Sequence, residues 1–353
     1  MARVTWTGLA REGVDLMNSF KRINAAVNFQ KPDRVPVIAQ VFGHAGVVSG
    51  VSLGEYVQDG RLLAECQLKA LKRYGYDAVF ALMDVCVETE ALGSSLAYRS
   101  HQYPAVTFHA FSKHTNLDSL SIPDPREAGR MPGLLEAARI LRTELGDDVL
   151  VVGCILGPMT LATQLVGIKE ALYMAIDDSE GFTRLLNFCA DVVIRFGVAQ
   201  IESGAHLPIV FEPSGSPAVV PFQFFREFIL PCLTRVFHHL KLAGGRANWL
   251  HIAGPAGSIL PFYHGAGVDI ANFDFCVDSG EAQDALPRTC LDGNIKPLDF
   301  VAESSETIAR ESTRLMDLFA DRGGFILSSG CEIPPEAKPE NITAMVSAAG
   351  KAR

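Results

Sequence analysis

Positively charged side chains are in the minority in this sequence. Its 353 residues contain 31 Lys and Arg against 40 Asp and Glu, so the formal net charge is −9. A chain with this charge is poorly suited to wrapping nucleic-acid phosphates or to lying on an anionic membrane. It would also repel a highly carboxylated substrate. The charge balance therefore argues against all three kinds of partner.

Targeting and disulfide signals are also missing. The first 30 residues carry charges every few positions and contain no apolar segment of signal-peptide length. The longest uncharged stretch, 149–168, is interrupted by Gly, Pro, Thr and Gln, which is typical of a buried strand and helix rather than a membrane span. The 8 cysteines include no CxxC pair, so we expect reduced thiols. We therefore expect a cytoplasmic protein.

Internal repeats and low-complexity tracts are likewise absent. Hydrophobic residues make up 48% of the chain and charged residues 20%, with 31 Gly and 19 Pro. This is the balance of a globular α/β protein rather than of a disordered or fibrous one. A length of 353 residues fits either two ordinary domains or one large barrel-type domain.

Eight apolar runs of strand length recur along the chain, with stretches of helical periodicity between them, among which are Leu53–Tyr74, Pro221–Leu242 and Ile259–Gly265. Strand followed by helix, eight times, is typical of an α/β protein with a (β/α)8 TIM barrel. A doubly wound sheet is the alternative, but it usually opens with a glycine-rich phosphate loop, and none follows the first run. We predict one barrel domain over residues 1–353. The predicted strands are Val35–Phe42, Asp77–Asp84, Val149–Ile155, Pro208–Glu212, Arg246–His251, Val268–Asp274, Thr289–Asn294 and Gly324–Ser329.

Three segments lie outside the predicted repeats of strand and helix. Residues 1–30 are predicted to form a helical lead-in, and Asn341–Ala349 a closing helix. Residues 90–147 form an insertion after the second strand. Its short extended piece, Tyr103–Phe108, predicts a hairpin or a lid beside the barrel mouth.

Side chains that can bind a metal ion gather at the predicted strand ends, where barrels of this kind carry out their chemistry. His251, Asp274, Glu212 and Cys331 together offer nitrogen, oxygen and sulfur donors. Such a set suits a borderline metal ion, and zinc is the best match. Each residue taken alone is more often a hydrogen-bonded structural group or a core thiol, so both interpretations stay open here.

Carboxylates and aromatic rings are predicted at the same rim. Asp84 and Glu88 follow the second strand and are candidates for paired acid–base carboxylates, with helix capping or a solvated loop as the alternative. Five phenylalanines lie in or near the predicted strands, and those that point inward would line an apolar pocket. These are Phe42, Phe80, Phe108, Phe211 and Phe273.

Several segments, taken in order, resemble the uroporphyrinogen decarboxylase superfamily over nearly the whole chain. The corrinoid-dependent methyltransferase branch, which includes methylcobamide:coenzyme M methyltransferases, is the most similar. The resemblance implies a (β/α)8 barrel, a zinc site at its mouth and a corrinoid protein that docks over the mouth. His44 and Ser214, at the rim, are then predicted to contact the corrinoid. The segments are PDRVPV, EYVQDGRLLAECQLKALKRYGYDAVF, VETEALG, LGPMTLATQLVG, EPSGSPAVVPFQFFREFILP, LHIAGP and, most specific, FILSSGCEIPPEAKPENITAMV.

The chain departs from the metal pattern of that branch, which is His-x-Cys followed far downstream by Cys. His251 and Cys331 match the pattern, but Ala253 stands at the first thiol position. His251, Asp274 and Cys331, completed by Glu212, could still hold zinc, or the metal is absent. The decarboxylase branch fits less well, because it carries an arginine-bearing substrate loop where this chain has RVPVIAQVFGHAG.

The loss of one thiolate should raise the Lewis acidity of a bound zinc, since each thiolate donates charge to the metal. We therefore expect transfer of a methyl group from a small donor, such as an aryl methyl ether, to cob(I)alamin on a partner protein. Glu212, Asp84 and Glu88 are the predicted catalytic carboxylates. Three alternatives stay open: methyl transfer from methylcobamide to a thiol, decarboxylation of a carboxylated tetrapyrrole, and a metal-free, non-catalytic partner of a corrinoid protein.

Overall fold

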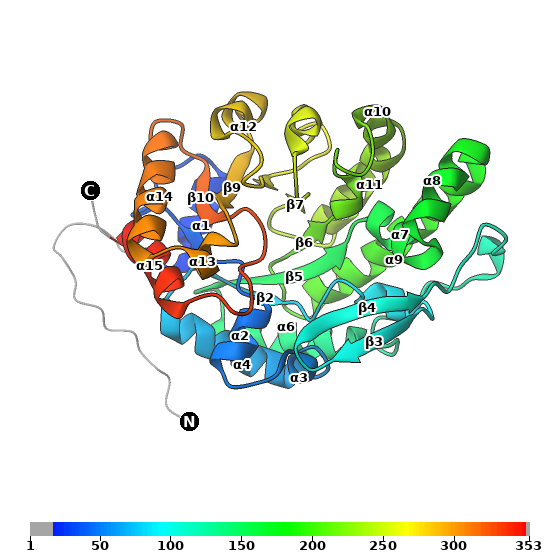
Figure 1. The fold of residues 1–353 in the computed structure, drawn as a ribbon, viewed down its shortest axis with the longest axis horizontal. Coiled ribbons are helices and arrows are strands. Elements are labelled where there is room, and N and C mark those ends of the chain that lie inside the picture. The colour runs from blue at the N-terminus through cyan, green and yellow to red at the C-terminus, as the bar shows by residue number, and fades with distance from the viewer. Residues whose placement is uncertain (1–16, 351–353) are drawn as a thin grey trace.

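The strands form one eight-stranded sheet that curves into a barrel (Figure 1). The computed structural model describes residues 17–350. All seven neighbouring strand pairs are parallel, in the spatial order β1-β10-β9-β8-β7-β6-β5-β2. The predicted barrel is confirmed, and each of the eight predicted runs overlaps one of its strands. The strands are β1 Val37–Ile38, β2 Ala78–Ala81, β5 Leu150–Leu156, β6 Leu207–Phe211, β7 Trp249–His251, β8 Ile270–Asn272, β9 Cys290–Ile295 and β10 Phe325–Ser329.

The barrel closes between its first two strands without a regular ladder. The amide of Asp77, just before β2, donates to the carbonyl of Val37 in β1 at 2.8 Å. Side chains alternate along each strand, so one set fills the barrel and the other packs against the surrounding helices. The two sets form separate buried clusters.

Helices surround the barrel, and their ends follow local sequence signals. For example, α4 begins after Asp59, whose side chain accepts the amides of Arg61 and Leu62, and ends at Gly75, which has a φ of 75°. The helices are α1 Ser19–Val27, α2 Gly43–Val48, α3 Leu53–Tyr56, α4 Gly60–Tyr74, α5 Val87–Ala91, α6 Met131–Leu145, α7 Pro158–Val166, α8 Ile168–Asp177, α9 Ser179–Glu202, α10 Phe222–Phe224, α11 Leu230–Leu242, α12 Ser279–Ala285, α13 Asp299–Ala302, α14 Ser305–Leu318 and α15 Pro339–Gly350.

Three predicted helices differ in detail from the observed ones. The stretch 53–74 is divided into α3 and α4, because Asp59 starts a new helix. The stretch 221–242 contains a π-helical turn at Phe225–Ile229, just before Pro231, which lacks an amide for regular helical bonding. The stretch 259–265 is instead a 3-10 helix, Ala256–Phe262, with Pro261 inside it.

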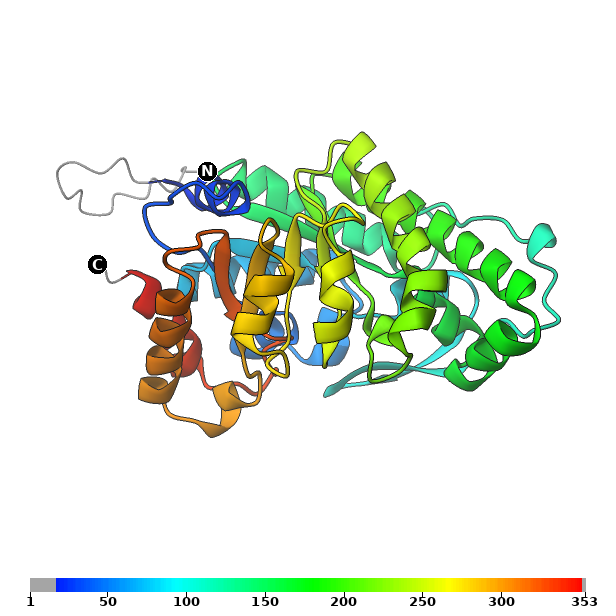
Figure 2. The ribbon, with the colours of Figure 1, turned by 90° about the horizontal axis from the view of Figure 1, so that it is seen from above.

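The described part of the predicted lead-in contains α1, which packs on the barrel; residues 1–16 lie outside the described residues. In Figure 2, α1 lies on the side of the molecule away from the hairpin formed by β3 Ser95–Arg99 and β4 Gln102–Phe108. The side chains of Ile23 and Ala26 join the apolar cluster inside the barrel. This helix therefore helps to cover the end of the barrel opposite the mouth.

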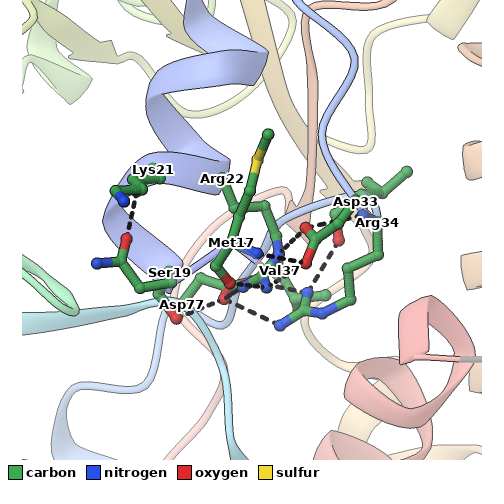
Figure 3. A network of polar contacts seen from close by, with 10 residues as sticks. Met17, Ser19, Lys21, Arg22, Asp33, Arg34, Val37 and Asp77 are labelled. Carbon is green, nitrogen blue, oxygen red and sulfur yellow. Dashed lines mark hydrogen bonds and ion pairs between the residues drawn. The ribbon is translucent and has the colours of Figure 1, made fainter. Parts of the chain in front are cut away.

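A buried ion-pair network fastens α1 to the barrel (Figure 3). The Asp77 carboxylate accepts hydrogen bonds from Arg22 Nη1 at 2.6 Å, Arg34 Nη1 at 2.8 Å, Ser19 Oγ at 2.7 Å and the Val37 amide at 2.8 Å. The network joins the lead-in to the place where the barrel closes.

The predicted insertion contains a hairpin, as expected. Its antiparallel strands are β3 Ser95–Arg99 and β4 Gln102–Phe108, and α6 follows them. At its far end the insertion is bonded to α7, because the Phe111 amide donates to the Leu165 carbonyl at 3.0 Å. The hairpin is a separate two-stranded sheet beside the barrel.

The cysteines and the helices can be compared with the expectations of reduced thiols and of no membrane span. All eight cysteines are free; Cys276 is exposed, Cys331 is partly exposed and the other six are buried. Over residues 17–350, no helix is both long enough and apolar enough to cross a membrane.

Candidate active site

The lining of the barrel differs between its two halves. Phe42, Phe80 and Phe211, after or within β1, β2 and β6, belong to one buried apolar cluster. The Phe42 ring lies edge-on to Phe80 and to Phe211, with centroids 4.9 and 6.0 Å apart. The strands β7 to β10 also carry side chains of this apolar cluster near their beginnings, but toward the mouth they and the segment after β1 carry buried polar side chains: Gln40, His251, Asn272, Asp292 and Ser328.

Two of the five phenylalanines considered for the pocket lie elsewhere. Phe273 belongs to the core between barrel and helices and packs edge-on against Phe319. Phe108 is exposed on β4. Of the five, only the other three lie inside the barrel, where Trp249 joins them with its ring centroid 6.1 Å from that of Phe80.

Asparagine, glutamine and aspartate side chains are linked in the polar half. Asn272 Nδ2 donates to Asp292 Oδ2 at 2.8 Å, and Gln40 Nε2 donates to the Ser329 carbonyl at 3.0 Å. Asp292 is fully buried, and this desolvation raises the pKa of its carboxyl to about 7.

His251 ends β7 and lies where the two halves meet. Its ring packs against Phe211 at a centroid distance of 4.9 Å, and its Nδ1 is buried without a hydrogen-bond partner. Burial lowers the pKa of the imidazole to about 3, so the ring is neutral. A neutral imidazole is the form that binds metals.

Asp274 and Cys331 lie near each other beyond the ends of β8 and β10. The Asp274 carboxylate accepts the Gly254 amide at 2.7 Å and the Cys276 amide at 3.4 Å. Burial raises the pKa of the Cys331 thiol to about 11, and the charges of Glu332 and Asp274 act in the same direction. A hydrogen bond with the backbone of Glu332 lowers this pKa but does not outweigh the burial. The Cys276 thiol also faces Asp274, and burial with that charge raises its pKa.

These residues do not form a metal site in the described structure. Within residues 17–350, no three His, Cys, Asp or Glu side chains are grouped so that they could hold a metal ion. Asp274 is engaged with backbone amides, and Ala253 supplies no donor. The arrangement thus does not fit a bound zinc ion, and zinc stays a prediction from the sequence.

Asp84 is engaged by an arginine from the insertion. Arg130, which precedes α6, binds Asp84 through Nη1 and Glu90 through Nε, the latter at 2.6 Å. It also lies 5.2 Å from the centroid of the Tyr98 ring in the hairpin. The sequence-based interpretation of Asp84 as an acid–base carboxylate did not anticipate this arginine, which Asp84 shares with Glu90.

Glu88 is a buried carboxyl without an arginine partner of this kind. It lies in the first turn of α5, and its Oε1 accepts the Leu156 amide of β5 at 2.8 Å. Desolvation raises the pKa of this carboxyl to about 7, and the nearby Asp84 charge acts in the same direction. Glu88 can therefore hold a proton at neutral pH.

Glu212 caps the beginning of α7. Its carboxylate accepts the Met159 amide at 2.9 Å, the Thr160 amide at 2.7 Å and the Thr160 hydroxyl at 2.5 Å. Gly157 provides the space for this carboxylate, since a Cβ at that position would lie 2.2 Å from Glu212 Oε2. Both oxygens are thus used to satisfy helix amides, and these contacts favour a structural role.

His44 and Ser214 also have partners within the protein. His44 is buried; its Nδ1 donates to the Pro335 carbonyl at 2.9 Å, so its Nε2 accepts from the Tyr74 hydroxyl at 2.8 Å. Ser214 is bonded to the Thr163 hydroxyl at 2.9 Å. The predicted corrinoid contacts of these two residues stay predictions, and the burial of His44 leaves it little surface for one.

Three polar residues near the mouth had no part in the sequence-based site: Arg130, Tyr103 and Glu332. Tyr103 donates from β4 to Glu332, the residue after Cys331. The Tyr103–Glu332 hydrogen bond and the Arg130–Asp84 ion pair have no local sequence signal, because each joins segments far apart in the chain.

The fold is that of the (β/α)8 barrel enzymes, which as a class work at the C-terminal strand ends. The chain belongs to the uroporphyrinogen decarboxylase family, whose model matches residues 18–352. Among curated relatives, a methylcobamide:CoM methyltransferase (MtaA) of Methanosarcina barkeri is 27% identical over 338 residues, covering 93% of this chain and 96% of the relative. A uroporphyrinogen decarboxylase of Syntrophotalea carbinolica is 29% identical over 303 residues, covering 83% of this chain and 84% of the relative.

A solved structure extends this similarity to three dimensions. It is a methyltransferase from Methanosarcina mazei, with a TM-score of 0.87 and 25% sequence identity, and the match covers 95% of this chain and 99% of that one. The predicted family, barrel and methyltransferase class are confirmed by these findings.

Proposed function

We propose that this enzyme transfers a methyl group from an aryl methyl ether to the cob(I)alamin of a partner corrinoid protein. The observation that carries the proposal is the two-sided mouth. An aromatic wall of Phe42, Phe80 and Phe211 suits the ring of the donor. The buried polar side chains toward the mouth on β7 to β10 can form hydrogen bonds with its oxygen atoms. The methylcobamide:CoM methyltransferases among the relatives support the corrinoid part.

The reaction needs a proton for the departing oxygen. Cob(I)alamin attacks the methyl carbon, the carbon–oxygen bond breaks, and its electron pair goes to the phenolic oxygen. We assign the proton to the Glu88 carboxyl, which becomes a carboxylate and is reprotonated from water. Of the three predicted catalytic carboxylates, Asp84 is engaged by Arg130 and Glu212 by α7, which favours Glu88. No step is assigned to a metal.

Exposed apolar side chains near the mouth support docking of the partner there. Val85, Val219, Phe275 and Leu298 follow β2, β6, β8 and β9, and each is exposed despite its size. A corrinoid protein must present its cobalt in line with the methyl carbon, so it must cover this face. Cross-linking groups placed at Val219 and Phe275 should be protected when the corrinoid protein is added, whereas one at Leu242 should stay accessible.

A second candidate is methyl transfer from methylcobamide to a thiol, which the names of the relatives favour. A decarboxylase fits less well because Arg130, the arginine beside Asp84, already binds two carboxylates. A cytoplasmic location belongs to the proposal and is supported by the eight free cysteines. Zinc analysis of the wild type and of Cys331→Ala tests the metal prediction: unchanged zinc would exclude Cys331 as a ligand.

A panel of methyl donors tests the proposed function. The purified protein is mixed with cob(I)alamin and, separately, with methoxylated phenols, methylamines and methylated thiols, and methylcob(III)alamin is followed by its absorption spectrum. We expect turnover with methoxylated phenols, reduced at least about tenfold in Glu88→Gln, because one general acid is lost. Glu65→Gln, an exposed carboxylate on α4, is the matched control and should behave like the wild type. Methylation of a thiol from methylcobalamin, with every ether inert, would favour the second candidate.

A further inference from the structure

The loop that follows β10 carries Cys331 at the mouth, and the barrel holds it on both sides. The Gly330 amide donates to the carbonyl of Ile295 at the end of β9, at 2.8 Å. The Ile333 amide donates to the carbonyl of Gln40 beyond β1, at 3.0 Å. The backbone on each side of Cys331 is therefore tied to a neighbouring strand.

A further contact to this loop comes from the insertion. Tyr103 Oη in β4 donates to Glu332 Oε1 at 2.5 Å. The Gly43 amide, at the start of α2, donates to Tyr103 Oη at 2.9 Å and approaches Glu332 Oε1 at 3.4 Å. A Cβ at Gly43 would lie 2.7 Å from Tyr103 Oη, so this approach requires glycine. Hairpin, α2 and the Cys331 loop thus meet at one phenol.

The other tyrosine of the hairpin reaches a different part of the mouth. Tyr98 Oη donates to Glu90 Oε1 on α5 at 2.5 Å, beside Arg130. The turn of the hairpin rests on α3, where the Gly54 amide donates to the Ser100 carbonyl at 3.1 Å. The hairpin is therefore fastened at several points, and Tyr103 is its link to Cys331.

We propose that Tyr103 is a positioning residue that fixes the Cys331 loop through Glu332. When the hairpin is seated, the phenol holds the Glu332 carboxyl, and with it the backbone one residue from the thiol. A hairpin that moves away would release this hold and leave the loop attached by the backbone bonds of Gly330 and Ile333 alone, which would then open more often. The importance of Cys331 rests on the proposed function, but the coupling itself is measurable without methyl transfer.

The two accessible thiols make the coupling measurable. Cys276→Ser removes the exposed thiol, so that iodoacetamide then modifies chiefly Cys331, which mass spectrometry quantifies. Hydrogen–deuterium exchange of residues 325–338 reports independently on the Gly330 and Ile333 amides. In this background, Tyr103→Phe should speed the modification of Cys331 about tenfold and speed amide exchange in the loop, the effect of losing one buried hydrogen bond.

Matched variants separate this coupling from general loosening. Tyr98→Phe makes the same chemical change in the same hairpin and should leave the rate of Cys331 modification within about twofold of the background. Glu332→Gln keeps an oxygen that accepts from Tyr103 and should stay close to the background, whereas Glu332→Ala should match Tyr103→Phe.

Three results would overturn the proposal. One is an unchanged rate of Cys331 modification in Tyr103→Phe, and another is an equal increase in Tyr98→Phe, which would mean that the whole hairpin loosens. If Tyr103→Phe unfolds, the Glu332 variants decide, and equal rates in Glu332→Gln and Glu332→Ala would refute the coupling. A chain that shows the coupling but methylates nothing would refute only the proposed function.

Discussion

Replacement of Asp77 by Asn should weaken the attachment of the lead-in to the barrel. The Asp77 side chain is fully buried and accepts from two guanidinium groups, a hydroxyl and an amide. In the variant, each arginine still has another group that stabilises its charge. Arg22 keeps Asp33, at 2.7 and 2.9 Å, and the Arg34 side chain is 22% exposed to water.

The remaining contacts set the size of the effect. Removing one partner of a buried ion pair costs roughly 3–5 kcal/mol of unfolding free energy. Because neither arginine is left without a partner or water, we expect the lower end, about 3 kcal/mol. A large domain loses roughly 2 °C of melting temperature per kcal/mol, so the midpoint should fall by about 6 °C.

Thermal unfolding followed by circular dichroism measures this change. Asp148→Asn is the matched control, since Asp148 is an exposed carboxylate that accepts from Asn18 near the same helix at 3.0 Å. The control should melt within about 1 °C of the wild type. If Asp77→Asn melts together with this control, the network does not hold α1 to the barrel.

Two further predictions concern buried carboxylates. Burial raises the pKa of Asp292 in the folded protein to about 7, from its ordinary value of 3.8. Its contribution to stability is therefore full below about pH 4, falls as the pH rises to about 7 and is constant above it. Chemical denaturation across this range should show the wild type losing stability relative to Asp292→Asn, and a constant difference would contradict the prediction. Gly157→Ala should displace Glu212 from α7 and cost about 1–3 kcal/mol, because its Cβ would lie 2.2 Å from Glu212 Oε2. Gly265→Ala, with its nearest contact at 3.6 Å, is the control for this loss of melting temperature, and equal melting of the two variants would argue against the cap.

The fold could be predicted because each strand carries its own signal. Runs such as Val149–Ile155 are apolar and bounded by turn residues, and eight such runs with helices between them leave few architectures. The helix boundaries were predicted less well, because they depend on single residues. The break before Gly60 depends on Asp59 acting as an N-cap, and the π-helical turn at Phe225–Ile229 depends on Pro231. Those effects compete with a helical periodicity that continues across them.

The site was predicted only as a location. Strand ends mark the mouth, so Glu88, His251 and Cys331 could be placed near it from the sequence. Their partners could not be predicted, because Arg130 meets Asp84, and Tyr103 meets Glu332, across large sequence separations. Glu212 offered a weak signal, since the Gly157–Pro158 start of α7 has no side-chain cap of its own.

The most direct test of the proposed function follows the methyl group itself. A methoxylated phenol with a trideuterated methyl group is incubated with cob(I)alamin and this protein, and both products are analysed by mass spectrometry. We predict trideuteromethyl cobalamin and free phenol in equal amounts, with both reduced at least about tenfold by Glu88→Gln. Cobalamin that stays unlabelled with every methoxylated phenol, while the same protein methylates a thiol from methylcobalamin, would contradict it.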